Sequence, residues 1–148
     1  MGWWPFSRRQ AESGRAPDYY REGLKLAGEE KYHEALTSFR LALRSQPKDS
    51  DIMQQMAVVY THIGMPEEAI RFYEAAIRAS DDAPAAHYGL AFILLKQGDE
   101  ASARRHLREF LTHPPGGEQA AAHVEHARKT LERLETPGSG EGIAEAGE

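Results

Sequence analysis

The stretch EEKYHEALTSFRLALRSQP, residues 29–47, places small and large side chains in a fixed order along one helix face. Ala35 is followed four residues later by Phe39 and seven residues later by Ala42, and Pro47 ends the run. Small residues let two helix backbones approach closely, and an aromatic ring fills the space that remains between them. The pattern therefore predicts a helix that packs tightly against neighbouring helices.

The same order of residues returns twice, each time 34 positions further along the chain. Turn-forming glycines stand before the second and third copies, at Gly64 and Gly98, and Glu30 takes this place in the first copy. A repeat of this length indicates one structural unit used three times. The aligned positions are Ala35, Ala69 and Ala103; Phe39, Tyr73 and Leu107; and Ala42, Ala76 and Phe110.

Each copy contains two apolar stripes with helical spacing, separated by the turn. Pro66 suits the first turn of a helix, where a missing N–H costs nothing. Each unit is therefore predicted to be a helix–turn–helix hairpin, over residues 16–49, 50–83 and 84–117. One hairpin cannot bury its apolar face alone, so we expect the three units to stack into a solenoid.

Residues 118–135 form an amphipathic pattern that differs from the repeat. This spacing predicts a helix that caps the exposed end of the stack. The alternative is a partner-binding or coiled-coil helix, and a coiled coil would require a second chain. The apolar face comprises Ala120, Val124, Ala127, Leu131 and Leu134.

The two ends differ in composition from the repeats. Residues 136–148 are rich in Gly and Glu, which predicts a disordered acidic tail. Residues 1–15 are expected to be a flexible aromatic and basic segment. Its Trp3, Trp4 and Phe6 suit contact with a membrane interface or a partner, and the alternative is that they pack onto the domain.

The aligned residues resemble the tetratricopeptide repeat (TPR) family, whose motif is a 34-residue helical hairpin. The resemblance covers residues 16–117 and implies an all-α, right-handed α-solenoid of three TPR hairpins, followed by the C-terminal capping helix. It departs from the family pattern at Glu22, Asp81 and Phe110. For Phe110 the explanation is that the element packed against the last unit need not be a standard repeat.

In this family the first helix of each unit lines a concave groove. The resemblance places aromatic and aliphatic side chains at the centre of the groove, with amides and a few charges beside them, which suits a bound peptide. One TPR subclass binds C-terminal carboxylates of chaperones, but its Lys, Asn and Arg positions hold Tyr20, Leu24, Gln55, Ala85 and Gly89 here, so that mode is not expected. The predicted groove residues are Tyr20, Arg21, Leu24, Gln54, Gln55, Val58, His62, Tyr88, Phe92 and Lys96.

Nothing in the sequence predicts an enzyme, a metal site or a cofactor. The chain has no cysteine, and neither a Gly-rich phosphate loop nor a Ser–His–Asp order is found. Four histidines lie toward the C-terminal end. His123 and His126 could share a helix face, but the sequence indicates no third ligand to complete a metal site with them, so solvated surface side chains are expected. They are His106, His113, His123 and His126.

These observations predict a non-catalytic, cytoplasmic adaptor or scaffold that binds a partner protein or peptide in its groove. The formal net charge of −5 argues against nucleic acid as a general partner, and the lack of cysteine fits a reducing compartment. Two alternatives stay open. One is a membrane-associated assembly factor tethered by Trp3, Trp4 and Phe6, and the other is a scaffold that self-associates into a homo-oligomer.

Overall fold

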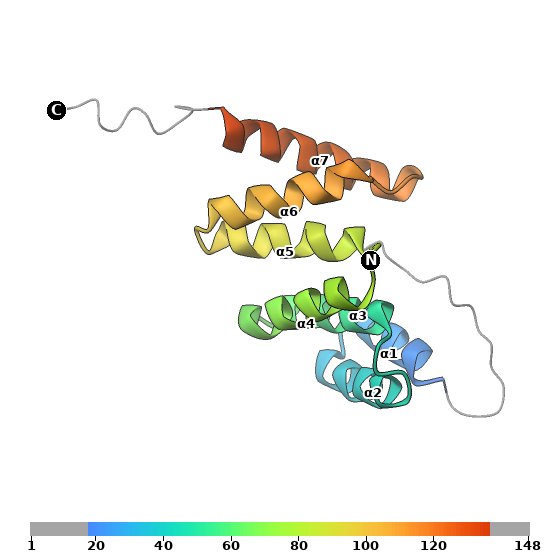
Figure 1. The fold of residues 1–148 in the computed structure, drawn as a ribbon. Helices are drawn as coiled ribbons and strands as arrows, with labels where there is room; N and C mark the ends of the chain where they lie inside the picture. Colours follow the sequence, from blue (N-terminus) through green and yellow to red (C-terminus); the bar gives the residue numbers. More distant parts are fainter. Residues whose placement is uncertain (1–17, 137–148) are drawn as a thin grey trace.

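A computed structural model describes residues 18–136, which form seven α-helices and no β-strand (Figure 1). Three antiparallel hairpins, α1/α2, α3/α4 and α5/α6, stack in chain order, and α7 packs on the last of them. The predicted all-α solenoid is confirmed. The helices are α1 (Tyr19–Gly28), α2 (Tyr32–Ser45), α3 (Ser50–His62), α4 (Pro66–Ala79), α5 (Pro84–Lys96), α6 (Glu100–Thr112) and α7 (Glu118–Glu135).

The turn inside each hairpin is built in the same way. Glu30, Gly64 and Gly98 all have positive φ angles, of 63°, 79° and 88°. In each turn the next residue donates its backbone N–H to a carbonyl of the preceding helix, at 2.9 Å in all three hairpins. This left-handed backbone favours glycine, which has no Cβ. The first hairpin therefore uses a residue that is poorly suited to its turn.

Replacing Glu30 by glycine is expected to raise the free energy of unfolding by about 1 kcal/mol. The left-handed conformation costs a non-glycine residue about 1–2 kcal/mol, and the greater chain entropy of glycine offsets part of this gain. Chemical denaturation measures the change. Gly98→Ala is the matched reverse substitution and should destabilise the protein. A Glu30→Gly variant less stable than the parent would contradict this account of the turn.

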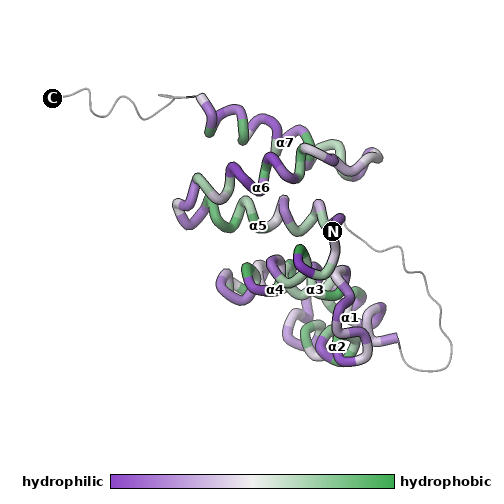
Figure 2. Tube along the Cα trace, in the orientation of Figure 1, coloured by the Kyte–Doolittle hydropathy of each residue, from purple (hydrophilic) through white to green (hydrophobic). Residues whose placement is uncertain are grey.

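The apolar side chains form a continuous core along the stack. Ala35 and Phe39 of α2 are fully buried, as the spacing in the sequence predicted. Gly23 of α1 faces Phe39 so closely that a Cβ on Gly23 would lie 2.5 Å from the ring atom Cε1. Small residues thus set the distance between helices within the hairpin. α5 is the most hydrophobic helix, which fits its place inside the stack (Figure 2).

α7 covers the end of the stack. Its Ala127 is buried, and Val124 and Leu131 pack beside it against Leu107 and Phe110 of α6. The predicted apolar face is the one that packs inward. Phe110 stands where the repeat usually has alanine, and it fills the space under a helix that is not part of a full hairpin.

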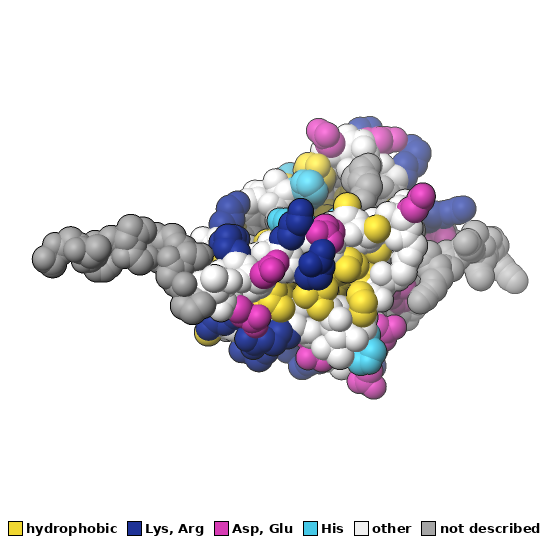
Figure 3. Space-filling model, turned by 90° about the horizontal axis from the view of Figure 1, so that it is seen from above, with side chains coloured by type: hydrophobic (Ala, Val, Ile, Leu, Met, Phe, Trp, Pro, Cys, Tyr) yellow, Lys and Arg dark blue, Asp and Glu magenta, His cyan; other side chains and the backbone are white. Residues whose placement is uncertain are grey.

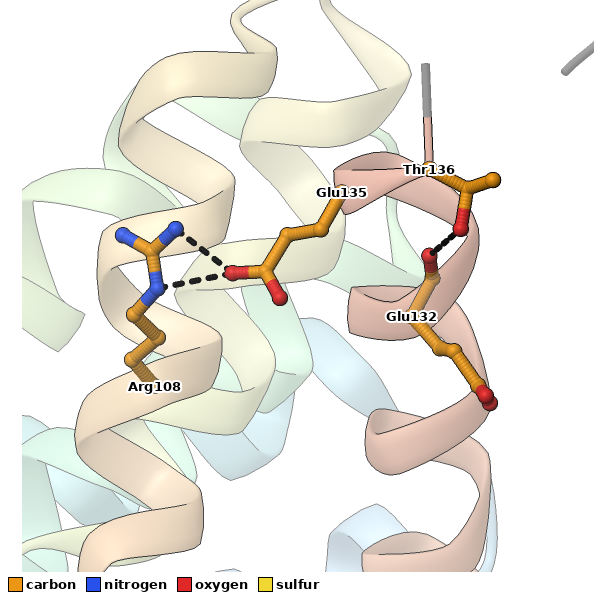
Figure 4. A network of polar contacts seen from close by, with 4 residues as sticks. All are labelled: Arg108, Glu132, Glu135 and Thr136. Atoms are coloured by element: carbon orange, nitrogen blue, oxygen red, sulfur yellow. Dashed lines mark hydrogen bonds and ion pairs between the residues drawn. The ribbon is translucent and has the colours of Figure 1, made fainter. Parts of the chain in front are cut away.

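Polar contacts stabilise the C-terminal end of α7. Glu135 accepts hydrogen bonds from Nε and Nη2 of Arg108 at 2.9 and 2.6 Å, and the Thr136 hydroxyl donates to the Glu132 carbonyl at 2.7 Å (Figure 4). An exposed ion pair of this kind contributes at most about 1 kcal/mol. Seen from the α7 end, the molecule shows charged side chains of both signs with smaller apolar areas between them (Figure 3).

Candidate functional site

A pocket of about 330 Å³ lies between α3 and α5, where these two first helices of successive hairpins contact each other. Its volume is at the lower end of the range for ligand pockets, about 300–1,000 Å³. Five of the ten predicted groove residues line it. The lining consists of Val58, Thr61 and His62 from α3, Tyr73 from α4, and Tyr88, Gly89, Phe92, Ile93 and Lys96 from α5.

The floor of the pocket is formed by Tyr73, which reaches between α3 and α5 from the second helix of its hairpin. Its side chain is 3% exposed. Burial raises the pKa of the Tyr73 hydroxyl far above its ordinary value, and a hydrogen bond with the Thr61 side chain offsets part of that rise. The absence of a side chain at Gly89 makes room for this hydroxyl, because a Cβ there would overlap it. The Tyr73 hydroxyl therefore stays neutral and is buried beneath the pocket, against Gly89 and Thr61.

One wall of the pocket is aromatic and is supported by α7. The rings of Tyr88 and Phe92 are 4.9 Å apart. His126 of α7 stacks on Phe92 with ring centroids 4.7 Å apart, and its Nδ1 lies 2.9 Å from the Tyr88 hydroxyl oxygen. His123 packs edge-on against Tyr88 at 5.0 Å. His126 is exposed, as predicted for a surface histidine, whereas His123 is half-buried, and both also contact the aromatic wall.

A signal for this contact was present in the repeat period. Leu24, Val58, Phe92 and His126 are successively 34 residues apart. Extending the alignment by one unit makes α7 a further first helix and puts His126 beside Phe92. Treating residues 118–135 only as a cap missed this relation.

The remaining predicted groove residues lie outside the pocket lining. Tyr20 is 5% exposed and packs on Phe39, with ring centroids 6.0 Å apart. Gln54 is 6% exposed, and its Nε2 donates to the Ser50 hydroxyl at 3.0 Å. Both face the core, so they offer no surface to a partner. The others are Arg21, exposed on α1; Leu24, partly buried against the core; and Gln55, half-buried on α3.

The rim of the pocket has a positive character. Lys96 and His62 are exposed and end α5 and α3, and the His62 ring stacks on Tyr32 at 5.2 Å with an interplanar angle of 6°. Among the described residues, the pocket lining includes no Asp or Glu.

A second histidine pair, outside this pocket, joins α5 to α6. The Nδ1 atoms of His87 and His106 lie 3.0 Å apart, which is a hydrogen bond when one ring donates and the other accepts. Burial lowers the pKa of both rings, that of His106 to about 4, while the Glu109 carboxylate acts in the opposite direction. Within residues 18–136, no group of three or more His, Cys, Asp or Glu side chains is arranged to hold a metal ion.

The membrane alternative depends on Trp3, Trp4 and Phe6, which lie outside the described residues, as does the predicted tail beyond Thr136. In the part of the chain that the structure covers, no helix is both long and apolar enough to cross a bilayer. Contact with a membrane and self-association both stay predictions.

Helical hairpins stacked in chain order define an α-solenoid repeat protein. Family models described as tetratricopeptide repeat match residues 20–84 and 64–124, and the chain belongs to this family.

Among curated proteins, the chain is similar to the photosystem I assembly protein Ycf3 of Synechococcus sp. (strain CC9605), with 31% identity over 91 residues. That match covers 60% of this chain and 53% of the relative. The chain thus spans about half the length of the curated relatives it matches.

Two solved structures share the fold. The Yersinia enterocolitica type III secretion chaperone SycD, in complex with a peptide of the translocator YopD, has a TM-score of 0.73 and 18% identity, with coverage of 78% of this chain and 88% of that chain. The first TPR of Spaghetti (RPAP3), bound to an HSP90 peptide, has a TM-score of 0.65 and 15% identity, with coverage of 77% and 90%. At these identities the likeness shows the fold alone.

Proposed function

We propose that this chain is a non-catalytic TPR adaptor that holds a peptide segment of a partner protein in the pocket between α3 and α5. The observation that carries the proposal is the pocket itself, which combines apolar walls with the exposed side chain of Thr61. Recognition sites for peptides use apolar pockets for anchoring side chains and a few placed polar groups for orientation. Val58 and Phe92 provide the walls, and Thr61 provides an accessible hydroxyl.

The relatives support an adaptor more than any other class of protein. The SycD structure holds a peptide of its translocator, and the Spaghetti structure holds an HSP90 peptide. The curated relatives are photosystem I assembly proteins. Chaperones and assembly factors both act by binding other polypeptides, and the pocket described above offers this chain the means to do the same.

Removing the pocket should remove partner binding. Phe92→Ala deletes an aromatic wall, and truncating an anchoring contact of this kind costs about 2 kcal/mol, or roughly thirtyfold in affinity. Thr61→Arg is a second variant that fills the pocket from an exposed position. Affinity capture from the source lysate, followed by titration of the captured protein against each variant, measures the loss.

The control is Arg78→Ala, which changes an exposed residue of α4 that does not line the pocket. It should capture the partner as the parent does. Circular dichroism establishes that every variant keeps its helices. If both pocket variants bind the captured protein with parental affinity, the site lies elsewhere and the proposal is wrong.

A further inference from the structure

The pocket differs in charge from the rest of the chain. Asp and Glu outnumber Lys and Arg by 23 to 18 in the sequence. The described residues around the pocket nevertheless include a lysine and a histidine and no carboxylate. A concave site lined by one sign of charge attracts ligands of the opposite sign. The pocket lining therefore differs from the acidic balance of the chain, because its only charged side chain among the described residues is Lys96, with the hydrogen-bond donor His62 beside it.

The two basic side chains occupy equivalent places in successive hairpins. His62 and Lys96 are 34 residues apart and end α3 and α5. A cation in the last turn also favours the negative end of the helix dipole, and this contribution to stability exists with or without a ligand. The stacking of His62 on Tyr32 has a separate effect, because it holds the imidazole in one orientation at the pocket edge. Both donors thus stand at the same rim above apolar walls.

We infer that the partner segment carries an acidic side chain next to the apolar side chain that enters the pocket. This inference rests on the proposed function and specifies its ligand. The apolar residue would pack between Val58 and Phe92, and its acidic neighbour would accept hydrogen bonds from Lys96 and His62. The residues with which some TPR proteins hold a chain-terminal carboxylate are absent, so the acid is assigned to a Glu or Asp side chain within the segment.

The test uses three fluorescent decapeptides with blocked ends and a central leucine, flanked by Glu, by Gln or by Lys. Anisotropy titrations with the full chain should give the tightest binding for the Glu peptide, about threefold to tenfold above the Gln peptide, since exposed charge pairs contribute about 0.2–1 kcal/mol each. The Lys peptide should bind most weakly. A probe with Gln flanks and a free C-terminal carboxylate should bind no better than its blocked form.

Two variants make the test specific to the pocket. Lys96→Glu should reverse the order of the Glu and Lys peptides, and Arg78→Glu, the same charge change outside the pocket, should leave it unchanged. Equal affinity for the three blocked peptides, or a Glu preference that survives in Lys96→Glu, overturns the inference. So does a gain from the free C-terminus. If none of the probes binds, this inference also fails, whereas the capture experiment decides the proposed function separately.

Discussion

Replacing Gly23 by alanine should lower the free energy of unfolding by about 3 kcal/mol, although alanine normally stabilises a helix interior relative to glycine by about 1 kcal/mol. The reason is the close approach of α1 and α2. A Cβ on Gly23 would lie 2.5 Å from Cε1 and 2.6 Å from Cδ1 of Phe39, and that ring is fully buried. The ring cannot withdraw freely, because it lies in the buried core beside Tyr20. Chemical denaturation of the two proteins measures the loss.

The same helix supplies the control. Gly28 lies at the end of α1, and a Cβ there would meet nothing within 4 Å. Gly28→Ala should therefore be neutral or slightly stabilising. Phe39→Leu should also cost less in the Gly23→Ala background than in the parent, because the smaller side chain relieves the overlap. Additive effects of Gly23→Ala and Phe39→Leu would show that steric contact is not the cause.

Acidification from pH 7.5 to pH 5 should destabilise the protein by roughly 1 kcal/mol through the His106–His87 pair, because solvent screens part of the effect at these half-buried rings. Burial lowers the pKa of His106 to about 4, below the ordinary value near 6.5. The unfolded chain therefore binds a proton at higher pH than the folded chain does. The stability that the neutral His106 ring contributes to the folded state is fully present above pH 6.5 and is lost as the pH falls from 6.5 toward 4.

His87 contributes to this effect, because two charged rings cannot keep the 3.0 Å contact between their Nδ1 atoms. Glu109 near the pair favours protonation, and Arg105 opposes it at His106. Thermal melts at the two pH values should show a smaller shift for His106→Gln than for the parent. His33→Gln, at an exposed position on α2, is the matched control and should keep the parental shift. An unchanged shift in His106→Gln would contradict the assignment.

The repeat period predicted the fold well because it records packing that occurs three times. Ala35 and Phe39 are buried where the spacing placed them, and Phe110 departs from the pattern at the one unit that α7 covers. The family register also identified Val58 and Phe92 in the pocket wall. These positions repeat in every unit, so the sequence of one hairpin informs the next.

The sequence was less informative about which polar side chains point into the core and which side chains contact a neighbouring helix. Tyr20 and Gln54 are polar and were predicted to face the groove, but each packs against its own hairpin or its neighbour. The contribution of Tyr73 to the pocket depends on the close approach of α4 to Gly89, which spacing within one helix does not reveal. Contacts between helices are set by rotation about the helix axes, and residue periodicity fixes that rotation only approximately.

The ring of His126 stacks on Phe92, and its Nδ1 lies close to the hydroxyl of Tyr88, so the last helix also shapes the wall of the pocket. Helix α7 thus both caps the stack and borders the pocket. A substitution on α7 can change this wall without altering any of the three hairpins. In a repeat protein built in this way, the shape of the pocket can change while the packing of the hairpins stays the same.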